Sequence, residues 1–413
     1  MSQTLNETPL GSRLHIAIFG RRNAGKSSLI NALTNQRAAI VSDVPGTTTD
    51  PVRKTMEILP IGPVVIIDTA GIDDTGQLGR VRVERTLRVL RQTDLALVVL
   101  DPTAGVDGYE EDLLARIRER GVAAVGVVNK IDLHPDDGEL VAWARERDLP
   151  VASVSALTRE GIELLKQRII ENAPSGWAQP TILGDLIAPG DVVVMCIPID
   201  KAAPKGRLIL PQVMAIRDVL DHGGVAMMAR ERELPHALAT LERKPRLVVT
   251  DSQVVLKAGS DTPEGVLFTS FSILFARYKG DLGELVRGAK AIWRLRPGDR
   301  VLIAEACTHH RQPDDIGKVQ IPRWLRHAAG GELDIQWSSG GDFPDDLASY
   351  RLVVHCGACM INRQEMLARI EQARRAGVPI VNYGVFLAAV HGVLERALEP
   401  FPAALHAWRG NDG

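Results

Sequence analysis

Apolar runs alternate with amphipathic segments along most of the chain. Short uninterrupted apolar runs are typical of buried strands, and apolar positions that recur every three or four residues are typical of helices. In the first part of the chain this pattern predicts strands at 14–19, 64–67, 95–100, 123–128 and 151–154, and helices at 80–92, 110–120 and 160–172. Strands that alternate with helices in this way indicate a doubly wound α/β domain.

The pattern resumes after a break at 173–176, which contains Pro174 and Gly176. A second segment predicts strands at 191–199, 225–229 and 247–251 with helices at 211–221 and 234–242, and a third predicts strands at 299–304 and 350–354. We therefore expect an α/β protein of three domains. The expected boundaries are a flexible tail at 1–12 and domains at 13–174, 179–262 and 263–413.

Composition narrows the class of protein. Of the 413 residues 45% are apolar and 24% are charged, and the net charge is -2. That charge gives no electrostatic footprint for nucleic acid, and no apolar stretch approaches the length of a membrane span. Residues 1–12 lack the basic and apolar regions of a signal peptide. We expect a cytoplasmic protein with no nucleic-acid or membrane partner.

A phosphate-binding loop follows the first predicted strand. Residues 20–27 read Gly-Arg-Arg-Asn-Ala-Gly-Lys-Ser and lead into an amphipathic helix, which is the context of a P-loop. Lys26 is expected to reach the β and γ phosphates, and the Ser27 hydroxyl to bind magnesium. The candidate nucleotide contacts in and beside this loop are Gly20, Arg21, Arg22, Asn23, Ala24, Gly25, Lys26, Ser27 and Ser28.

Further motifs occur in the order that a GTPase requires. Asp68 ends a predicted strand and opens Asp-Thr-Ala-Gly, so its carboxylate can hold the magnesium shell while the Gly71 amide meets the γ phosphate. Thr48, which follows Thr47, is the candidate switch threonine and a second magnesium ligand. The predicted catalytic residues are Lys26, Thr48, Asp68 and Gly71.

The base also has a predicted pocket. Asn129, Lys130 and Asp132 follow a strand, and the Asp132 carboxylate can accept hydrogen bonds from two guanine N–H groups that adenine lacks as a pair. The backbone of residues 155–157, which are Ser155, Ala156 and Leu157, completes the pocket. The motifs together predict a Ras-like P-loop GTPase that binds GTP and Mg²⁺.

Two positions depart from the Ras pattern. Ile72 stands where Ras-like enzymes place a water-orienting glutamine, so intrinsic hydrolysis should be slow. Asn23 and the Gly46-Thr47-Thr48 loop resemble the potassium-dependent GTPases related to the tRNA-modifying enzyme MnmE. That resemblance implies that K⁺ binds near Asn23 and supplies the charge of an arginine finger. The alternative is that Asn23 is only a loop-capping amide.

Three of the four cysteines follow predicted strands of the third segment. Cys307 comes after the strand at 299–304, and Cys356 and Cys359 come after the strand at 350–354. Because the carboxyl ends of parallel strands face one crevice, these cysteines can converge. The fourth, Cys196, lies inside an apolar run and is predicted to be a buried small hydrophobe.

The chemistry of this group allows more than one metal. Three thiolates beside His309, His310 and His355 fit structural zinc or an iron–sulfur cluster with one non-cysteine ligand. Soft sulfur ligands exclude magnesium and calcium. Reduced core cysteines without a metal are the alternative.

The linked motifs Cys307-Thr308-His309 and His355-Cys356-Gly357-Ala358-Cys359, behind a GTPase domain, resemble the HydF family of [FeFe]-hydrogenase maturation factors. Residues 205–212 resemble the dimerisation domain of that family. The resemblance implies a homodimeric scaffold that binds a [4Fe-4S] cluster in its C-terminal α/β domain. It also implies that the chain receives a transient di-iron subcluster precursor made with radical-SAM maturases and delivers it to apo-[FeFe]-hydrogenase. Cys307, Cys356 and Cys359 are then the cluster ligands, and His309, His310 and His355 are alternatives for the fourth.

Other functions fit parts of the sequence. An RNA-associated GTPase of ribosome assembly or tRNA modification, with a zinc-binding C-terminal domain, is compatible with the first domain but not with the near-neutral charge. A zinc adaptor with a degenerate GTPase conflicts with the intact Lys26, Ser27, Asp68 and Asp132. Under the hydrogenase-maturation reading, we expect the nucleotide state to act as a switch for partner binding.

Overall fold

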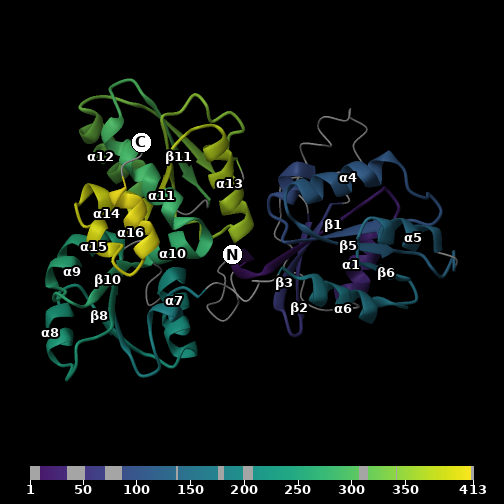
Figure 1. The fold of residues 1–413 in the computed structure, drawn as a ribbon, viewed down its shortest axis with the longest axis horizontal. Helices are drawn as coiled ribbons and strands as arrows, with labels where there is room; N and C mark the ends of the chain where they lie inside the picture. Colours follow the sequence, from purple (N-terminus) through teal and green to yellow (C-terminus); the bar gives the residue numbers. More distant parts are fainter. Residues whose placement is uncertain are drawn as a thin grey trace. The chain divides into compact units, whose positions relative to one another are not determined.

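The computed structural model describes residues 10–34, 52–69, 86–135, 138–174, 181–198, 208–306, 315–340 and 342–410. The chain divides into two compact units, residues 1–179 and 180–413, and each has its own hydrophobic core (Figure 1). Within the described residues, we find no helix with both the length and the apolar character needed to cross a membrane.

The first unit is built on a six-stranded sheet in the order β2-β3-β1-β4-β5-β6. Its strands are β1 (Leu14–Gly20), β2 (Val52–Ile58), β3 (Gly62–Asp68), β4 (Leu95–Leu100), β5 (Ala123–Val128) and β6 (Val151–Ser153). Its helices are η1 (Leu10–Ser12), α1 (Lys26–Thr34), α4 (Gly108–Glu119), α5 (Gly138–Glu146) and α6 (Ile162–Asn172), and residues 86–90 are also helical. Only β2 runs antiparallel to its neighbour.

Helices cover both faces of this sheet, which explains the uninterrupted apolar strands. Ile16 and Ile18 of β1 enter a core with α1 and α6, whereas Ala17 and Phe19 enter a second core with α4 and α5. Alternate residues of a strand point to opposite faces, so a strand buried on both faces is apolar at nearly every position, with His15 of β1 as a buried polar exception. The predicted doubly wound α/β architecture is confirmed for this unit.

The second unit contains two four-stranded parallel sheets, in the orders β10-β9-β7-β8 and β12-β11-β13-β14. The strands are β7 (Val192–Cys196), β8 (Val225–Ala229), β9 (Leu247–Thr250), β10 (Leu267–Ser270), β11 (Arg300–Glu305), β12 (Asp334–Ser339), β13 (Leu352–His355) and β14 (Ile380–Asn382). The α-helices are α7 (Leu210–Asp221), α8 (Leu234–Ala239), α9 (Val255–Asp261), α10 (Phe271–Lys279), α11 (Leu282–Ala289), α12 (Ile321–Ala329), α13 (Arg363–Arg375), α14 (Tyr383–Val390), α15 (Leu394–Ala397) and α16 (Pro402–Arg409). Shorter helical turns are η2 (Gly184–Leu186), η3 (Ser252–Val254), η4 (Lys290–Arg294) and the π-helix η5 (Ile316–Gln320).

The two sheets of this unit share one hydrophobic core, and the sequence predicted a middle and a C-terminal domain in this part of the chain. Helix α10 joins the two sheets, because its buried Phe271 and Phe275 belong to a core that includes residues of both, and it contacts α7 as well as α14. The first of these sheets also extends past the predicted boundary at residue 262, since β10 pairs with β9.

The neighbouring strands β11 and β13 bring the predicted metal region together. They run parallel, and Ala304 is the register partner of His355. Their carboxyl ends therefore lie at the same edge of the sheet, as the strand pattern predicted.

Candidate nucleotide site and cysteine site

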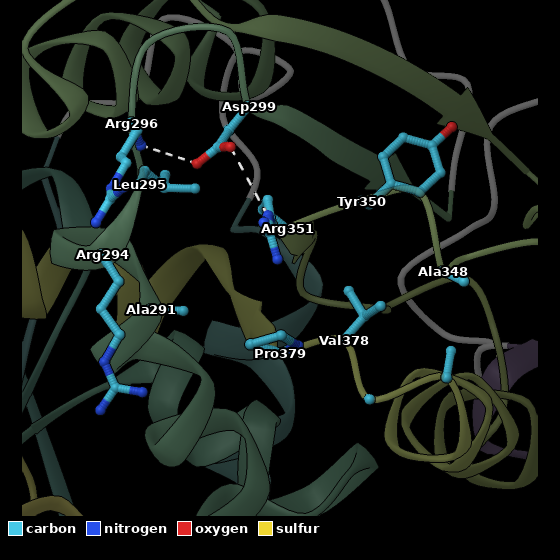
Figure 2. Close-up of a pocket in the computed structure, with 12 residues that line it drawn as sticks. Ala291, Arg294, Leu295, Arg296, Asp299, Ala348, Tyr350, Arg351, Val378 and Pro379 are labelled. Carbon is cyan, nitrogen blue, oxygen red and sulfur yellow. Dashed lines mark hydrogen bonds and ion pairs between the residues drawn. The ribbon is translucent and has the colours of Figure 1, made fainter.

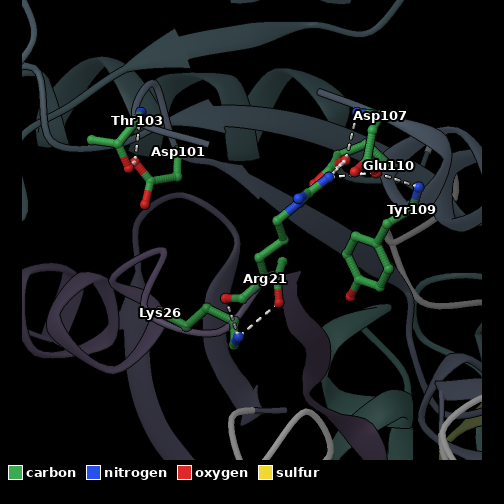
Figure 3. A network of polar contacts seen from close by, with 8 residues as sticks. Arg21, Lys26, Asp101, Thr103, Asp107, Tyr109 and Glu110 are labelled. Atoms are coloured by element: carbon green, nitrogen blue, oxygen red, sulfur yellow. Dashed lines mark hydrogen bonds and ion pairs between the residues drawn. The ribbon is translucent and has the colours of Figure 1, made fainter. Parts of the chain in front are cut away.

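The phosphate loop connects β1 to α1, and Lys26, Ser27 and Ser28 form the first turn of that helix. The Lys26 side chain is buried, and its Nζ donates to the carbonyl oxygens of Gly20 and Arg21, both at 2.7 Å (Figure 3). Ser27 Oγ donates to Asp68 Oδ2 at 3.1 Å. Two predicted magnesium-binding groups that are far apart in sequence are thus neighbours in the fold.

The backbone conformations of two loop residues explain why glycine and asparagine occur at these positions. Gly25 has a φ of +88° and packs so closely against the Asn129 amide that a Cβ would clash there. Asn23 has a φ of 63°, a left-handed conformation that asparagine adopts more readily than most residues. This conformation gives Asn23 a structural role in the loop, and its binding of potassium stays a prediction.

Asn129 links the phosphate loop to the predicted base pocket. Its Nδ2 donates to the Ala24 carbonyl at 2.9 Å, and its Oδ1 accepts from the Ala156 amide at 3.1 Å. Ser155 is fully buried and its hydroxyl accepts from a backbone amide of the same loop, whereas Leu157 is largely exposed. One side chain therefore holds the two predicted nucleotide-binding loops together.

Lys130 is held by a carboxylate that the sequence analysis missed. Its Nζ donates to Asp101 Oδ2 at 2.6 Å, just after the end of β4. Burial favours the neutral form of Asp101, but the hydrogen bonds from Lys130 and Thr103 outweigh it and lower the pKa of this carboxyl. The Asp132 side chain, in contrast, lies in an exposed position.

The Arg21 side chain forms a second network that the sequence analysis did not identify (Figure 3). Its guanidinium donates to both oxygens of Glu110, at 2.6 and 2.8 Å, and pairs with Asp107. These hydrogen bonds raise the pKa of Arg21 above its usual value, and those to Glu110 contribute most. Asp107 and Glu110 also form the capping box of α4, a signal that the sequence Asp-x-x-Glu contains. Arg21 thus anchors the loop to α4, and only its backbone remains for the phosphate site.

Several predicted nucleotide contacts lie outside the described residues. These are Thr47, Thr48 and Gly71, together with the departure from the Ras pattern at Ile72. Arg22 lies at an exposed position of the loop.

The cysteine region lies at the carboxyl edge of the β12-β11-β13-β14 sheet. Cys356 follows β13, its amide donates to the Ala304 carbonyl at 2.9 Å, and its Sγ accepts from the Ala306 amide at 3.1 Å. Cys359 is half-buried. Ala358, which lies between Cys356 and Cys359 in the chain, has a φ of 54°. Cys307, His309 and His310 lie outside the described residues, but Cys307 is covalently next to Ala306.

His355 makes two side-chain hydrogen bonds that explain its burial. Its Nδ1 lies 2.8 Å from the Cys356 carbonyl, and its Nε2 lies 3.1 Å from a guanidinium nitrogen of Arg369. Arg369 is itself buried, pairs with Glu365 at 3.0 Å and donates to the Gly340 carbonyl. Because a guanidinium can only donate, Nε2 accepts and Nδ1 donates. As a cluster ligand, His355 would have to give up one of these bonds.

Polar side chains from other elements surround residues 356–361, which we call the cysteine loop. Tyr383 donates to Glu305 at 3.2 Å, and burial, with the nearby Cys356 and Glu305, raises the pKa of the Tyr383 phenol. Lys279 is buried and donates to the Ile361 carbonyl at 3.1 Å, which fixes the far end of the loop. Within the described ranges, no three His, Cys, Asp or Glu side chains are grouped to hold a metal ion.

Three family models match parts of this chain. Residues 15–130 match the family model of the 50S ribosome-binding GTPase. Residues 182–280 match the hydrogen maturase F dimerization domain, and residues 283–400 match the hydrogen maturase F tetramerization domain. The last two matches together cover more than half of the 413 residues.

Curated relatives include tRNA modification GTPases MnmE. The protein from Chromobacterium violaceum is 38% identical over 159 residues, which is 38% of this chain and 34% of the relative. That from Symbiobacterium thermophilum is 41% identical over 171 residues, which is 41% of this chain and 37% of the relative. The chain thus spans little more than a third of the length of these two relatives.

Two solved structures show some similarity to this chain. Aquifex aeolicus Era, bound to GDP and aluminium fluoride, is 20% identical with a TM-score of 0.33 and covers 52% of this chain and 92% of its own. The G domain of the T. maritima FeoB iron transporter is 25% identical with a TM-score of 0.31 and covers 39% of this chain and 99% of its own.

The family matches fall in both units. The GTPase match lies in the first unit and includes Lys26, Ser27 and Asp68. The second carries the two hydrogen maturase F domains, and its cysteine loop falls within the second of them. The chain belongs to the hydrogen maturase F family and has an N-terminal GTPase domain.

Proposed function

We propose that this protein is a GTP-hydrolysing scaffold for hydrogenase maturation. It holds a [4Fe-4S] cluster on Cys307, Cys356 and Cys359, assembles the di-iron subcluster precursor and transfers it to apo-[FeFe]-hydrogenase. Its other partners are the radical-SAM maturases that make the precursor. We also propose that the protein is cytoplasmic.

The observation that carries the proposal is the hydrogen bond from the Ala306 amide to Cys356 Sγ at 3.1 Å. It sets the residue before Cys307 beside the Cys356 sulfur, although the two cysteines are 49 positions apart in the chain. Amide hydrogen bonds to sulfur are one of the ways in which proteins tune iron–sulfur clusters. The residues at this edge therefore fit a cluster held by thiolates.

The donor set agrees with iron rather than with a hard cation. Cys356 and Cys359 supply sulfur, and the described carboxylate nearby, Glu305, is engaged by Tyr383. A bound cluster would supply an electron-rich iron–sulfur centre to which a metal fragment can attach. The chain's own residues orient the loop, with Arg369 and His355 on one side and Lys279 at its end.

In the GTPase domain, each described group has a defined task. Lys26 exchanges its loop carbonyls for phosphate oxygens, Ser27 and Asp68 hold magnesium, and Asp132 selects guanine. Without a glutamine after Gly71, hydrolysis is slow, and potassium near Asn23 raises its rate.

Replacement of Asn23 by glycine should keep the left-handed loop while it removes the amide, so potassium stimulation should disappear and GDP binding should remain. Equal GTP turnover in sodium and potassium by the wild-type protein would rule out the cation role.

We further propose that the nucleotide state is a switch. Coupling requires that a partner binds the GDP and GTP states with different affinities. The direct comparison is the affinity of each maturase and of apo-hydrogenase for the protein with GDP and with a GTP analogue. Equal affinities in both states would remove the switch from the proposal.

The function itself is tested by maturation of apo-hydrogenase with purified components. Wild-type protein with the two maturases should yield hydrogen-evolving enzyme, and Cys356→Ala should yield none while its GTP turnover stays at the wild-type rate. Full maturation by Cys356→Ala would contradict the scaffold role. An RNA-associated GTPase, which the MnmE relatives favour, would instead support no maturation with any variant.

A further inference from the structure

The second unit contains a hollow at the edge of its C-terminal sheet opposite the cysteine loop. Its volume is about 540 Å³, and it is formed by the turns that precede β11, β13 and β14 (Figure 2). In a parallel sheet the amino ends of the strands share one edge, and β11 spans Arg300–Glu305. The hollow and the cysteine loop are therefore separated by on the order of 17 Å.

The charges around this hollow are unbalanced. Arg294, Arg296 and Arg351 line it, and Asp299 is the one carboxylate among its lining residues. Asp299 accepts from the Arg296 backbone amide at 2.8 Å and lies 3.8 Å from Arg351 Nε. Across the described ranges, no acidic side chain lies within ion-pair distance of the Arg294 or Arg296 guanidinium. Three arginines and one carboxylate thus line the hollow, in a chain whose net charge is -2.

The remaining walls determine what kind of molecule fits. Buried Leu295 and Val378, with Pro379, give the hollow an apolar floor, and Tyr350 lies across from Arg294 and Arg296 (Figure 2). Arginine pairs with phosphate and carboxylate groups through two parallel hydrogen bonds. The volume lies within the range of small-molecule sites.

We propose that this hollow binds a small organic polyanion, namely a phosphate ester or a polycarboxylate. The arginines hold the oxyanion groups, and the apolar floor contacts the carbon skeleton. This site is independent of the nucleotide site and the cysteine site.

The test is isothermal titration of the full-length protein with glycerol 3-phosphate and, separately, with tricarballylate at constant ionic strength. GDP and magnesium are kept saturating so that the P-loop is occupied. Saturable binding with a Kd below about 1 mM is expected for at least one probe. The double variant Arg294→Gln/Arg351→Gln should weaken it by roughly tenfold or more. The matched control is Arg217→Gln, which removes an exposed arginine of α7 that pairs with Asp221.

Each outcome has a defined meaning. Binding of only one probe assigns the site to that chemical class, and binding of both assigns it to oxyanions in general. Absence of saturable heat with both probes would overturn the proposal, as would a double variant that binds as well as Arg217→Gln. The double variant should keep wild-type GTP turnover and iron content, so this result is independent of the cluster.

Discussion

At the scale of single residues, His355 has a role that its sequence context did not suggest. Beside Cys356 it was one of three candidates for the fourth cluster ligand. The structure places it in a buried series that runs from Glu365 through Arg369 to His355 and the Cys356 carbonyl. Spacing along a sequence shows that a histidine is near a cysteine, but not which atoms its ring nitrogens contact.

Arg369→Met tests this series. The substitution leaves Glu365 as a buried charge without its partner and takes the donor from His355. Because removal of one member of a buried ion pair is costly, we expect the second unit to lose about 3 kcal/mol of unfolding free energy. Chemical denaturation monitored by circular dichroism measures it. Arg374→Met, on the exposed face of the same helix, is the control and should change stability little. Equal stabilities of the two variants would contradict the role given to Arg369.

The cysteines should differ in reactivity. Cys196 is fully buried, as its apolar context predicted, and burial raises the pKa of its thiol to about 11. At pH 8 it is therefore almost entirely protonated, and only the thiolate reacts quickly with iodoacetamide. In cluster-free protein we expect rapid labelling of half-buried Cys359 and slow labelling of Cys196 that accelerates toward pH 11 or on unfolding. Mass spectrometry of the labelled peptides measures both rates, and equal rates at pH 8 would refute the assignment.

At the scale of elements, the central strands and the edge strands β6 and β8 could be predicted, whereas the edge strands β2, β10, β12 and β14 could not. β1, β4 and β5 are buried on both faces, so their sequences are apolar apart from His15 of β1 and two glycines. β12 reads Asp-Ile-Gln-Trp-Ser-Ser and lies at a sheet edge with half-exposed residues, and β14 has only three residues. Such strands exist because a neighbour offers hydrogen bonds, which their own composition does not reveal.

Among the described residues, the edge of the sheet at β8 has no further strand beside it, and we propose this edge as the surface for dimerisation. β8 ends the β10-β9-β7-β8 sheet, and Val225 and Met228 are 52% and 56% exposed. Exposed apolar edges invite pairing with a second chain, and a lysine there prevents it. Met228→Lys should halve the assembly mass measured by light scattering after size exclusion. Leu256→Lys, at an equally exposed position of α9, should not. A Met228→Lys protein with the wild-type mass would place the dimer contact elsewhere.

At the scale of the whole molecule, the positions of the motifs were easier to predict than the packing of distant segments into shared cores. The sequence predicted that the P-loop, Asp68 and Asn129 lie at the ends of strands of a regular α/β pattern, and in the structure Ser27 contacts Asp68 and Asn129 contacts Ala24. It did not predict that the two sheets of the second unit share one core, because the packing of α10 depends on contacts between distant segments. The Arg21 and Asp101 contacts were missed for the same reason.

The claim that a cluster is bound by Cys307, Cys356 and Cys359 is central to the proposed function. The most direct measurement is the iron, sulfide and zinc content of anaerobically reconstituted protein, with electron paramagnetic resonance of the reduced sample, for the wild type and for Cys307→Ala, Cys356→Ala and Cys359→Ala. We predict about four irons and four sulfides per wild-type chain with the signal of a reduced [4Fe-4S] cluster, and loss of both in each variant. Stoichiometric zinc without a reducible cluster would contradict this account.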